Sequence, residues 1–214
     1  FQIFKAELLY PNKDGLYDTF KSIELNPDWV FKLSEYAKDK GIDFLGSAFD
    51  KSSVDLLEDI NVPAYKIASS ETTNLSLLHY TASKLKPLII STGMCDIIDV
   101  QEAINVCQSV GNNEIALLQC NSLYPQNIKD VNLKVIENYK NTFSCPVGFS
   151  DHTLGYTASI AAVGIGANIF EKHFTLNKKS DGPDHFYALE PAELRLYIQN
   201  IRDAHKALGD NNKI

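Results

Sequence analysis

The chain has 214 residues, of which 44% are hydrophobic and 22% charged, which is the composition of an ordinary soluble globular protein. This length fits one α/β domain better than two, so we expect residues 1–214 to form a single domain. The net charge of −7, without a run of lysine and arginine, argues against nucleic acid and anionic membranes as partners. No apolar stretch is long enough to span a bilayer. We expect a cytoplasmic protein whose four scattered cysteines (Cys95, Cys107, Cys120 and Cys145) stay reduced.

Seven short runs rich in β-forming residues recur along the chain, and each is followed by a helical pattern. The runs are residues 1–5, 43–49, 64–69, 87–92, 115–121, 146–150 and 168–175. Apolar spacing predicts one helix that stops at Gly111, one over 156–166, and a last helix from Pro191 to Gly209. The apolar stripe of the last helix is expected at Leu194, Ile198, Ile201 and Leu208.

Alternating strands and helices predict a parallel sheet, which is either open or closed into a barrel. No glycine-rich GxGxxG or GxxxxGK[ST] element follows a strand, and polar residues cluster after nearly every strand rather than at one point. We therefore predict a (β/α)₈ TIM barrel rather than a doubly wound sheet. Seven units are one fewer than such a barrel needs, and the chain does not begin with methionine. The barrel is therefore expected to be truncated at the N-terminus, with its first βα unit absent from this chain.

Two histidines follow neighbouring strands near the end of the chain. His152 lies in GFSDHT at 148–153, and His173 lies in EKHFT at 171–175. One helix separates the two strands, so they should be parallel neighbours whose imidazoles emerge at the same sheet edge. This arrangement suits a metal ion or an acid–base pair. We expect Asp151 to orient His152 or to cap a helix, and the residues Glu171 and Lys172 to point away from His173 and form a structural ion pair.

Lys66 lies in a strand that is predicted to be buried, where a lysine without a partner is rare. A phosphate or carboxylate partner is the preferred interpretation, and a Schiff-base lysine, as in class I aldolases, is the alternative. Several serines follow the other strands, and hydroxyl and backbone N–H groups hold phosphate well. For any single serine, helix capping is the commoner role. His185, in a loop, is more often structural than a substrate contact.

With these residues in place, the chain resembles the sialic acid synthase family, which comprises N-acetylneuraminate synthases and their pseudaminic and legionaminic acid relatives. The matching segments are FQ at 1–2, YKIASSE at 65–71, ISTGM at 90–94, LQCNSLYP at 118–125, GFSDHT, EKHFT, and GPD at 182–184. They run from end to end of the chain in the family's order. The resemblance implies a barrel enzyme that joins phosphoenolpyruvate to N-acetylmannosamine or a 2,4-diacetamido hexose. With water, this gives a nine-carbon 2-keto sugar acid and phosphate.

The resemblance also implies a role for each matching residue. His152 and His173 would hold a divalent metal ion, Mn²⁺ in preference to Mg²⁺. Phosphoenolpyruvate would be bound by Lys66 and by Ser47, Ser69, Ser91, Ser122 and Ser150. The sugar would be bound by Gln2, Glu71, Tyr124 and Asp184, and the reaction would depend on His152, His173, Glu71 and Lys66. The full-length enzyme would be a homodimer with a C-terminal antifreeze-like domain that this chain lacks.

Three other interpretations stay open from the residues alone. One is an aldolase that forms a Schiff base between Lys66 and a keto acid. Another is a non-catalytic barrel that binds a sugar or a phosphate and in which the histidines are only packed. A third is a heptulosonate- or octulosonate-phosphate synthase, which would need an additional basic pocket for a phosphorylated sugar, with Lys5 and Arg195 as weak candidates.

Overall fold

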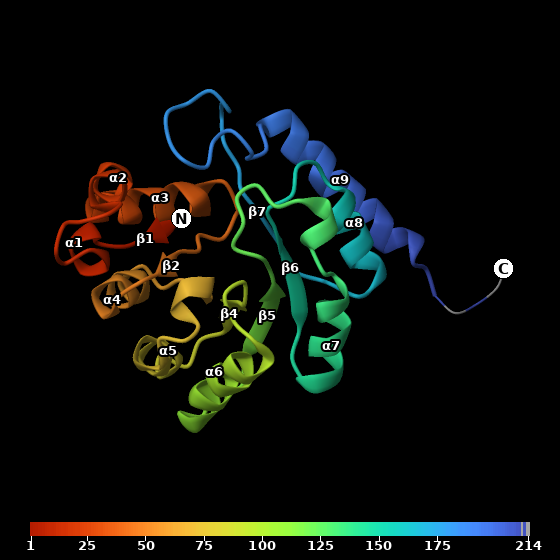
Figure 1. The fold of residues 1–214 in the computed structure, drawn as a ribbon, viewed down its shortest axis with the longest axis horizontal. Coiled ribbons are helices and arrows are strands. Elements are labelled where there is room, and N and C mark those ends of the chain that lie inside the picture. Colours follow the sequence, from red (N-terminus) through yellow and green to blue (C-terminus); the bar gives the residue numbers. More distant parts are fainter. Residues whose placement is uncertain (211, 213–214) are drawn as a thin grey trace. The chain divides into compact units, whose positions relative to one another are not determined.

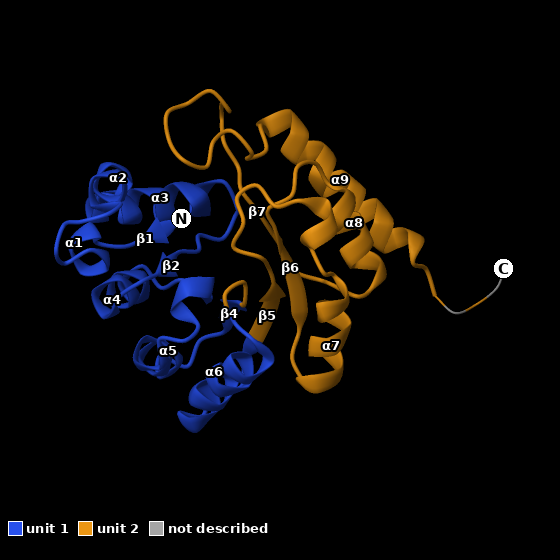
Figure 2. Ribbon diagram, in the orientation of Figure 1, with its two compact units in different colours: residues 1–91, 95–115 blue, residues 92–94, 116–214 orange. Residues whose placement is uncertain are grey.

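The computed structural model describes residues 1–210 and 212. The chain divides into two compact units, residues 1–91 with 95–115 and residues 92–94 with 116–214 (Figure 2). Both units alternate strands with helices, and every strand pair within a unit is parallel. The α/β class predicted from the sequence is therefore confirmed.

The first unit carries four parallel strands in the order in which they occur along the chain: β1 (Gln2–Ile3), β2 (Ser47–Ala48), β3 (Tyr65–Ile67) and β4 (Leu88–Ser91). The connections contain α1 (Ala6–Leu9), α2 (Tyr17–Ile23), α3 (Pro27–Asp39), α4 (Lys51–Asp59) and α5 (Leu75–Ala82), and α6 (Ile97–Ser109) follows β4 (Figure 1). Ser47 is paired in register with Gln2 on one side and with Lys66 on the other. Three residues that the sequence singles out therefore lie at one level of this sheet.

The second unit follows the same rule with three strands, β5 (Ile115–Gln119), β6 (Val147–Asp151) and β7 (Phe170–Lys172). Its helices are α7 (Lys134–Thr142), α8 (Thr157–Gly164) and α9 (Pro191–Ala207), and α8 lies beside α9 (Figure 1). In both units each strand is added next to the one before it. A doubly wound sheet would instead reverse direction at a switch point.

Local sequence explains where several helices begin. Asp50 caps α4 by accepting from the backbone N–H of Ser53, and Asp96 and Asp99 form a capping box at the start of α6. At α9, Pro191 occupies the first turn, where its missing N–H costs nothing. That helix ends before Gly209, whose φ of +60° is easily adopted only by glycine. The predicted bounds of the last helix are therefore confirmed to within two residues.

The strands are shorter than their apolar runs suggest. Only Ser47–Ala48 of the predicted strand 43–49 is in the sheet. The run 168–175 gives only Phe170–Lys172, after which the chain turns to a different partner. There the N–H of Leu189 donates to the carbonyl of His173, and the N–H of Thr175 donates to the carbonyl of Leu189. Apolar content predicts burial, whereas ladder hydrogen bonds depend on a partner that the local sequence does not contain.

The apolar stripe predicted for the last helix is wrong in part. Ile198 and Leu208 are exposed, and the one buried side chain of α9 is Tyr197. The hydroxyl of Tyr197 lies 2.7 Å from Ser159 Oγ in α8. A tyrosine buried by a neighbouring helix and satisfied by a serine is not visible in a count of aliphatic residues. None of the four cysteines forms a disulfide; Cys107 and Cys120 are buried, and Cys95 and Cys145 are partly exposed.

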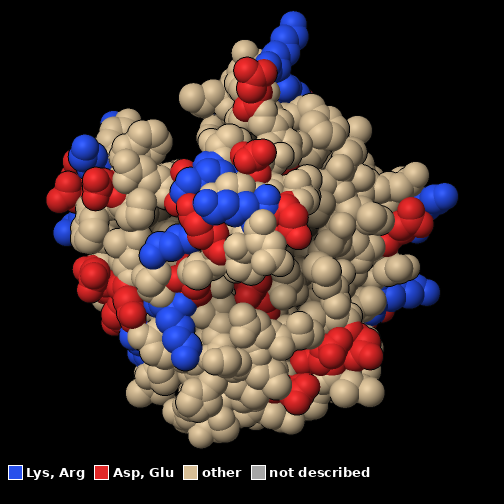
Figure 3. Space-filling model, turned by 60° about the vertical axis from the view of Figure 1, so that its left-hand side comes forward, with Lys and Arg blue, Asp and Glu red and all other residues tan. Residues whose placement is uncertain are grey.

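Charged side chains of both signs are interleaved on the face shown in Figure 3. Several charged side chains pair in the first unit, for example Lys21 with Glu7 at 3.0 Å and Lys84 with Asp55 at 2.8 Å. Exposed pairs of this kind contribute little to stability. Over residues 1–210 and 212, no helix has both the length and the apolar character needed to cross a membrane.

Asn112 provides a test of the packing in the first unit. Its buried amide donates to the carbonyls of Ala82 and Lys86, and its oxygen accepts from the N–H of Glu114. Because Asn112→Ala removes these three buried hydrogen bonds, we expect urea denaturation to show a loss of about 1–3 kcal/mol in unfolding free energy. The neighbouring exposed Asn113→Ala should stay within about 0.5 kcal/mol of the wild type. Equal effects of the two substitutions would contradict this account.

Candidate active site

In the first unit, the buried ammonium group of Lys66 is surrounded by polar groups. Lys66 is only 7% exposed, and its Nζ donates to Ser91 Oγ at 2.8 Å and to the carbonyl of Ile67 at 2.9 Å. Ser47 is paired with Lys66 in the sheet, and the side chains of Ser47, Ser69 and Ser91 are all buried. A cation among hydroxyl donors is a suitable setting for a phosphate or carboxylate. The structure thus places Lys66, Ser47 and Ser91 on three adjacent strands.

The two predicted sugar contacts of the first unit lie in different surroundings. Gln2 is exposed on β1. Glu71 ends a short 3₁₀ helix (Ser69–Glu71), and its carboxylate accepts from Ser70 Oγ at 3.2 Å and from Asn74 Nδ2 at 2.9 Å. Glu71 therefore already has a local structural task next to the start of α5.

In the second unit, the two histidines lie together. His152 follows β6 and His173 follows β7, and their ring centroids are 5.3 Å apart. The prediction that both imidazoles emerge at one sheet edge is confirmed. The cause is the parallel register, which sets Ser150 opposite Glu171 and Asp151 opposite Lys172.

His152 is buried and held in one orientation. Its Nδ1 lies 2.9 Å from the carbonyl of Asn121, so Nδ1 carries the proton and Nε2 keeps a free lone pair. Burial lowers the pKa of His152, the Asn121 carbonyl partly opposes that shift, and the neighbouring His173 adds to it. His152 is therefore a neutral imidazole with an open nitrogen, the form that binds metals or takes up a proton.

His173 is also held neutral, although its side chain is 25% exposed. Burial lowers the pKa of His173, and Asp184 and Glu171 oppose the shift. Its Nδ1 lies 3.6 Å from an Asp184 carboxylate oxygen and 3.3 Å from the Tyr187 hydroxyl. Asp184, a predicted sugar contact, is thus brought to the histidine pair.

Tyr124, the predicted sugar contact of the 118–125 segment, also reaches the histidine pair. The ring of Tyr124 lies 4.3 Å from that of His152 and 5.9 Å from that of His173, measured between centroids. Burial is the main reason that the pKa of Tyr124 is raised, and a hydrogen bond with Ser122 opposes this shift. Tyr124 remains 49% exposed, so part of its surface is open to a ligand.

The orientation of Glu171 differs from the one predicted from the sequence. We expected it to point away from His173, but residues two apart in a strand share a face. Ser150 Oγ donates to Glu171 Oε1 at 2.7 Å, and the charge of Glu171 acts on both histidines. Ser150, a predicted ligand of phosphoenolpyruvate, is therefore already hydrogen-bonded to a carboxylate in this structure.

Asp151 and Lys172 pair with each other, so the predicted structural ion pair exists but with a different acid. Lys172 Nζ lies 3.2 Å from Asp151 Oδ1, and both side chains are almost wholly buried. Burial lowers the pKa of Lys172, and Asp151 opposes that shift. Asp151 accepts from Thr153 and Ser159, so its carboxylate serves the turn after β6 and the helix α8. The Nδ1 of His152 is oriented by the Asn121 carbonyl instead.

The histidine pair fits a metal ion as a two-residue site. No group of three or more His, Cys, Asp or Glu side chains forms a ready-made metal site within residues 1–210 and 212. The donors that do lie together are two neutral imidazoles, one with its second nitrogen bound to a carbonyl, which is the usual arrangement for a metal-binding histidine. Two protein ligands would leave the remaining coordination positions for substrate and water.

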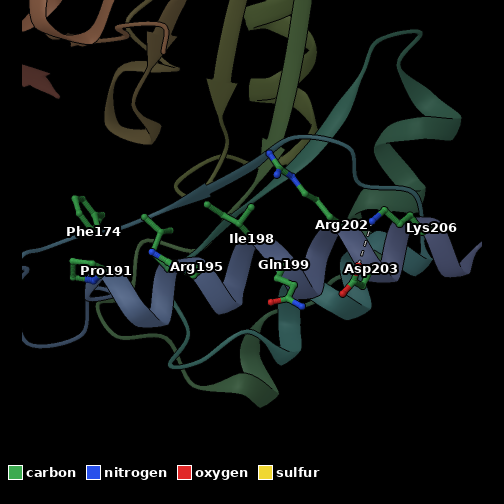
Figure 4. A pocket seen from close by; sticks show the side chains of 9 residues that line it. Phe174, Pro191, Arg195, Ile198, Gln199, Arg202, Asp203 and Lys206 are labelled. Atoms are coloured by element: carbon green, nitrogen blue, oxygen red, sulfur yellow. Dashed lines mark ion pairs between the residues drawn. The ribbon is translucent and has the colours of Figure 1, made fainter. Parts of the chain in front are cut away.

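A hollow with a volume of about 580 Å³ lies along α9 (Figure 4). Neither histidine lines it. Arg195, Arg202 and Lys206 line it together with Phe174 and Ile198. The linear sequence shows no basic run, but helical spacing gathers these three cations on one side of α9. Lys5 is instead bonded to Ser52 Oγ at 3.1 Å in the first unit. Arg195 therefore lines this hollow, which neither histidine lines.

These features define an α/β protein that holds a buried cation among hydroxyls in one unit and a pair of neutral imidazoles in the other. The chain belongs to the NeuB family, whose sequence pattern matches residues 3–213.

Individual relatives agree with this assignment. The chain is 41% identical to N,N'-diacetyllegionaminic acid synthase of Legionella pneumophila over 231 residues, covering 100% of this chain and 65% of the relative. It is 37% identical to human N-acetylneuraminate-9-phosphate synthase over 194 residues, covering 90% and 54%. The crystal structure of the N-acetylneuraminic acid synthetase of Leptospira borgpetersenii matches with a TM-score of 0.94 at 29% identity, covering 100% and 75%. The chain thus spans less than two thirds of the length of these two curated relatives.

Two residues near the histidines escaped the sequence prediction. Tyr187 lies 14 residues beyond His173 in a loop, and no local signal marks it as a neighbour. Glu171 could have been found by a strict two-residue alternation counted back from His173. The structure places Tyr124 and Asp184 beside the histidines, Ser122 next to Tyr124, and Ser150 next to Glu171, while their roles as ligands stay predictions.

The neutral histidines predict a specific loss of stability in acid. Both pKa values lie below that of a free imidazole, so the unfolded chain takes up protons first and unfolding free energy falls as the pH drops below about 6.5. In buffer with a chelator, His152→Gln/His173→Gln should lose less unfolding free energy between pH 7 and pH 5 than the wild type. The exposed His205→Gln serves as the control, and a wild-type pH dependence in the double variant would sink this account.

Proposed function

We propose that this chain carries the catalytic part of a synthase that condenses phosphoenolpyruvate with an N-acetylated amino sugar. The products would be a nine-carbon 2-keto sugar acid and phosphate. The observation that carries the proposal is the pair of neutral imidazoles at the ends of β6 and β7, 5.3 Å apart, in a chain of the NeuB family. Relatives named for legionaminic acid and N-acetylneuraminate-9-phosphate synthesis support the substrate class.

The proposed reaction forms one carbon–carbon bond, forms one carbon–oxygen bond from water to C2, and breaks the carbon–oxygen bond between C2 and phosphate. C3 of phosphoenolpyruvate attacks the aldehyde carbon of the open-chain sugar, and positive charge develops at C2. Water adds to C2, and the proton that it loses is balanced by the one taken up by the former aldehyde oxygen. Collapse of the tetrahedral intermediate expels phosphate and leaves the ketone.

The proposed roles are assigned residue by residue, from the positions that match the family. Lys66, with Ser47, Ser69 and Ser91, would bind the anionic groups of phosphoenolpyruvate, because a buried ammonium among hydroxyls compensates negative charge strongly. Ser122 and Ser150 are proposed as further phosphoenolpyruvate ligands, and Gln2, Glu71, Tyr124 and Asp184 as sugar ligands. His152 and His173 would hold a divalent metal ion, Mn²⁺ in our proposal, which when bound supplies Lewis-acid polarisation of the aldehyde oxygen.

The Schiff-base alternative is less well supported by the surroundings of Lys66. A lysine nucleophile needs a free lone pair, whereas Lys66 Nζ donates to a hydroxyl and to a backbone carbonyl. Borohydride treatment in the presence of a keto acid would trap Lys66 covalently only in an aldolase. A heptulosonate- or octulosonate-phosphate synthase would require a basic group beside the histidines, and Arg195 lines the hollow along α9 instead.

Phosphate release from phosphoenolpyruvate tests the proposal in the full-length gene product. N-acetylmannosamine and a 2,4-diacetamido hexose are supplied in turn, with Mn²⁺ or with a chelator. We expect Mn²⁺-dependent release with one acceptor, and a loss of more than about 100-fold in kcat/KM for His152→Ala and for Lys66→Met. His205→Ala, in an exposed position of α9, should keep wild-type activity.

Folded protein that releases no phosphate with either acceptor would overturn the proposed reaction. Release that a chelator does not affect would overturn the metal requirement alone. We further propose that the enzyme acts in the cytoplasm and that it is a homodimer. Light scattering of the full-length protein would test the homodimer.

A further inference from the structure

The cross-strand pairs at the ends of β6 and β7 lie on two different faces. Ser150 and Glu171 face the side of the histidines, where they share a 2.7 Å hydrogen bond. Asp151 and Lys172, one residue further along, face the side of α8 and α9. The histidines themselves follow directly, so Asp151 is bonded to His152 and Lys172 to His173 through single peptide bonds.

The polar atoms on the helix side form a closely satisfied network. Asp151 Oδ1 accepts from the N–H and the hydroxyl of Thr153 at 2.8 and 2.7 Å, and Oδ2 accepts from Ser159 Oγ at 2.7 Å. Lys172 Nζ contacts Asp151 at 3.2 Å, donates to the carbonyl of Thr153, and lies 5.7 Å from the centroid of the Tyr197 ring. Four segments of the second unit therefore meet at one buried ion pair.

Stability alone does not account for such a pair. Removing two charges from water costs about as much as their attraction returns, and apolar residues of similar volume are often equally stabilising in the same place. An ion pair instead favours one strand register, because its two charges meet only in that register. A shift of one residue along β7 would move Lys172 to the opposite face and leave Asp151 buried without its partner.

We propose that the Asp151–Lys172 pair is the positioning device that sets the spacing of the two backbone segments that carry His152 and His173. Lys172 holds the residues on both sides of His152, through the Asp151 carboxylate and the Thr153 carbonyl, while its own neighbour in the chain is His173. No hydrogen bond links the two imidazoles in the described part of the chain, so their 5.3 Å separation depends on the backbone that this pair holds, together with the contacts of each ring to Asn121, Tyr124 and Tyr187. The role as a device for catalysis rests on the proposed function.

The test removes both charges together, because a single substitution would leave one buried charge unpaired. Asp151→Asn/Lys172→Met keeps the side-chain volumes similar and cuts the link from Lys172 to Thr153. Ser159→Ala is a milder second variant that removes one donor to Asp151 and suits a helix. Ile136→Ala, a fully buried position in α7 of the same unit, provides a destabilised control whose apolar side chain makes no hydrogen bond or ion pair with either residue.

Two readouts are independent of turnover. The first is the set of imidazole NMR signals in metal-free protein, assigned with His152→Ala and His173→Ala. The second is Mn²⁺ affinity, measured by EPR titration. We expect the double variant to shift the signals of His152 and His173 but not those of His79 and His205, and to weaken Mn²⁺ binding about 10–100-fold. Ser159→Ala should shift the same two signals less, and Ile136→Ala should change neither readout.

Wild-type imidazole signals in the double variant would overturn the positioning role. If the double variant does not fold, wild-type signals in Ser159→Ala would overturn it instead. So would a loss of Mn²⁺ affinity in Ile136→Ala as large as in the double variant. If the wild type binds no Mn²⁺ or releases no phosphate, the proposed function fails, and the NMR signals alone decide whether the pair positions the histidines.

Discussion

The parallel register of β6 and β7 is the constraint on which the histidine site depends. Parallel strands joined by a helix end at the same edge, and this brings together two residues that are 21 positions apart in the chain. The register also determines which side chains share a face. One face carries the imidazoles with Ser150 and Glu171, and the other carries the buried ion pair. A chain that slipped by one residue would exchange these two sets.

The two units differ in how they accommodate buried ionisable side chains. In the first unit, Lys66 is tolerated within a buried strand because the Ser91 hydroxyl and the Ile67 carbonyl accept hydrogen bonds from its Nζ. In the second, burial favours the uncharged form of both histidines, so their nitrogens remain available as ligands or bases. A reaction that needs an anion held and a carbonyl polarised would draw on both kinds of group.

The residues around the histidines also show how much of a site lies outside the motifs. The GFSDHT and EKHFT segments supply the imidazoles, but the Asn121 carbonyl sets the tautomer of His152, and Tyr187 lies against His173. Ser159 and Tyr197 come from two helices and complete the network on the far side of the strands. Their contribution is one of orientation, which in metal and acid–base sites determines affinity and rate as much as the identity of the ligands does.

The sequence by itself determined the α/β class, the seven strands and the two histidines, because strand-sized apolar runs and helical spacing are local patterns. It also identified Lys66, since a lysine in an apolar strand is unusual wherever that strand packs. Tertiary structure decided the rest. The strands shortened where no ladder partner was in reach, and Tyr197 rather than the aliphatic stripe became the buried residue of α9. Lys172 paired with Asp151 across the sheet and not with its neighbour Glu171, because adjacent residues in a strand point to opposite faces while residues in register meet.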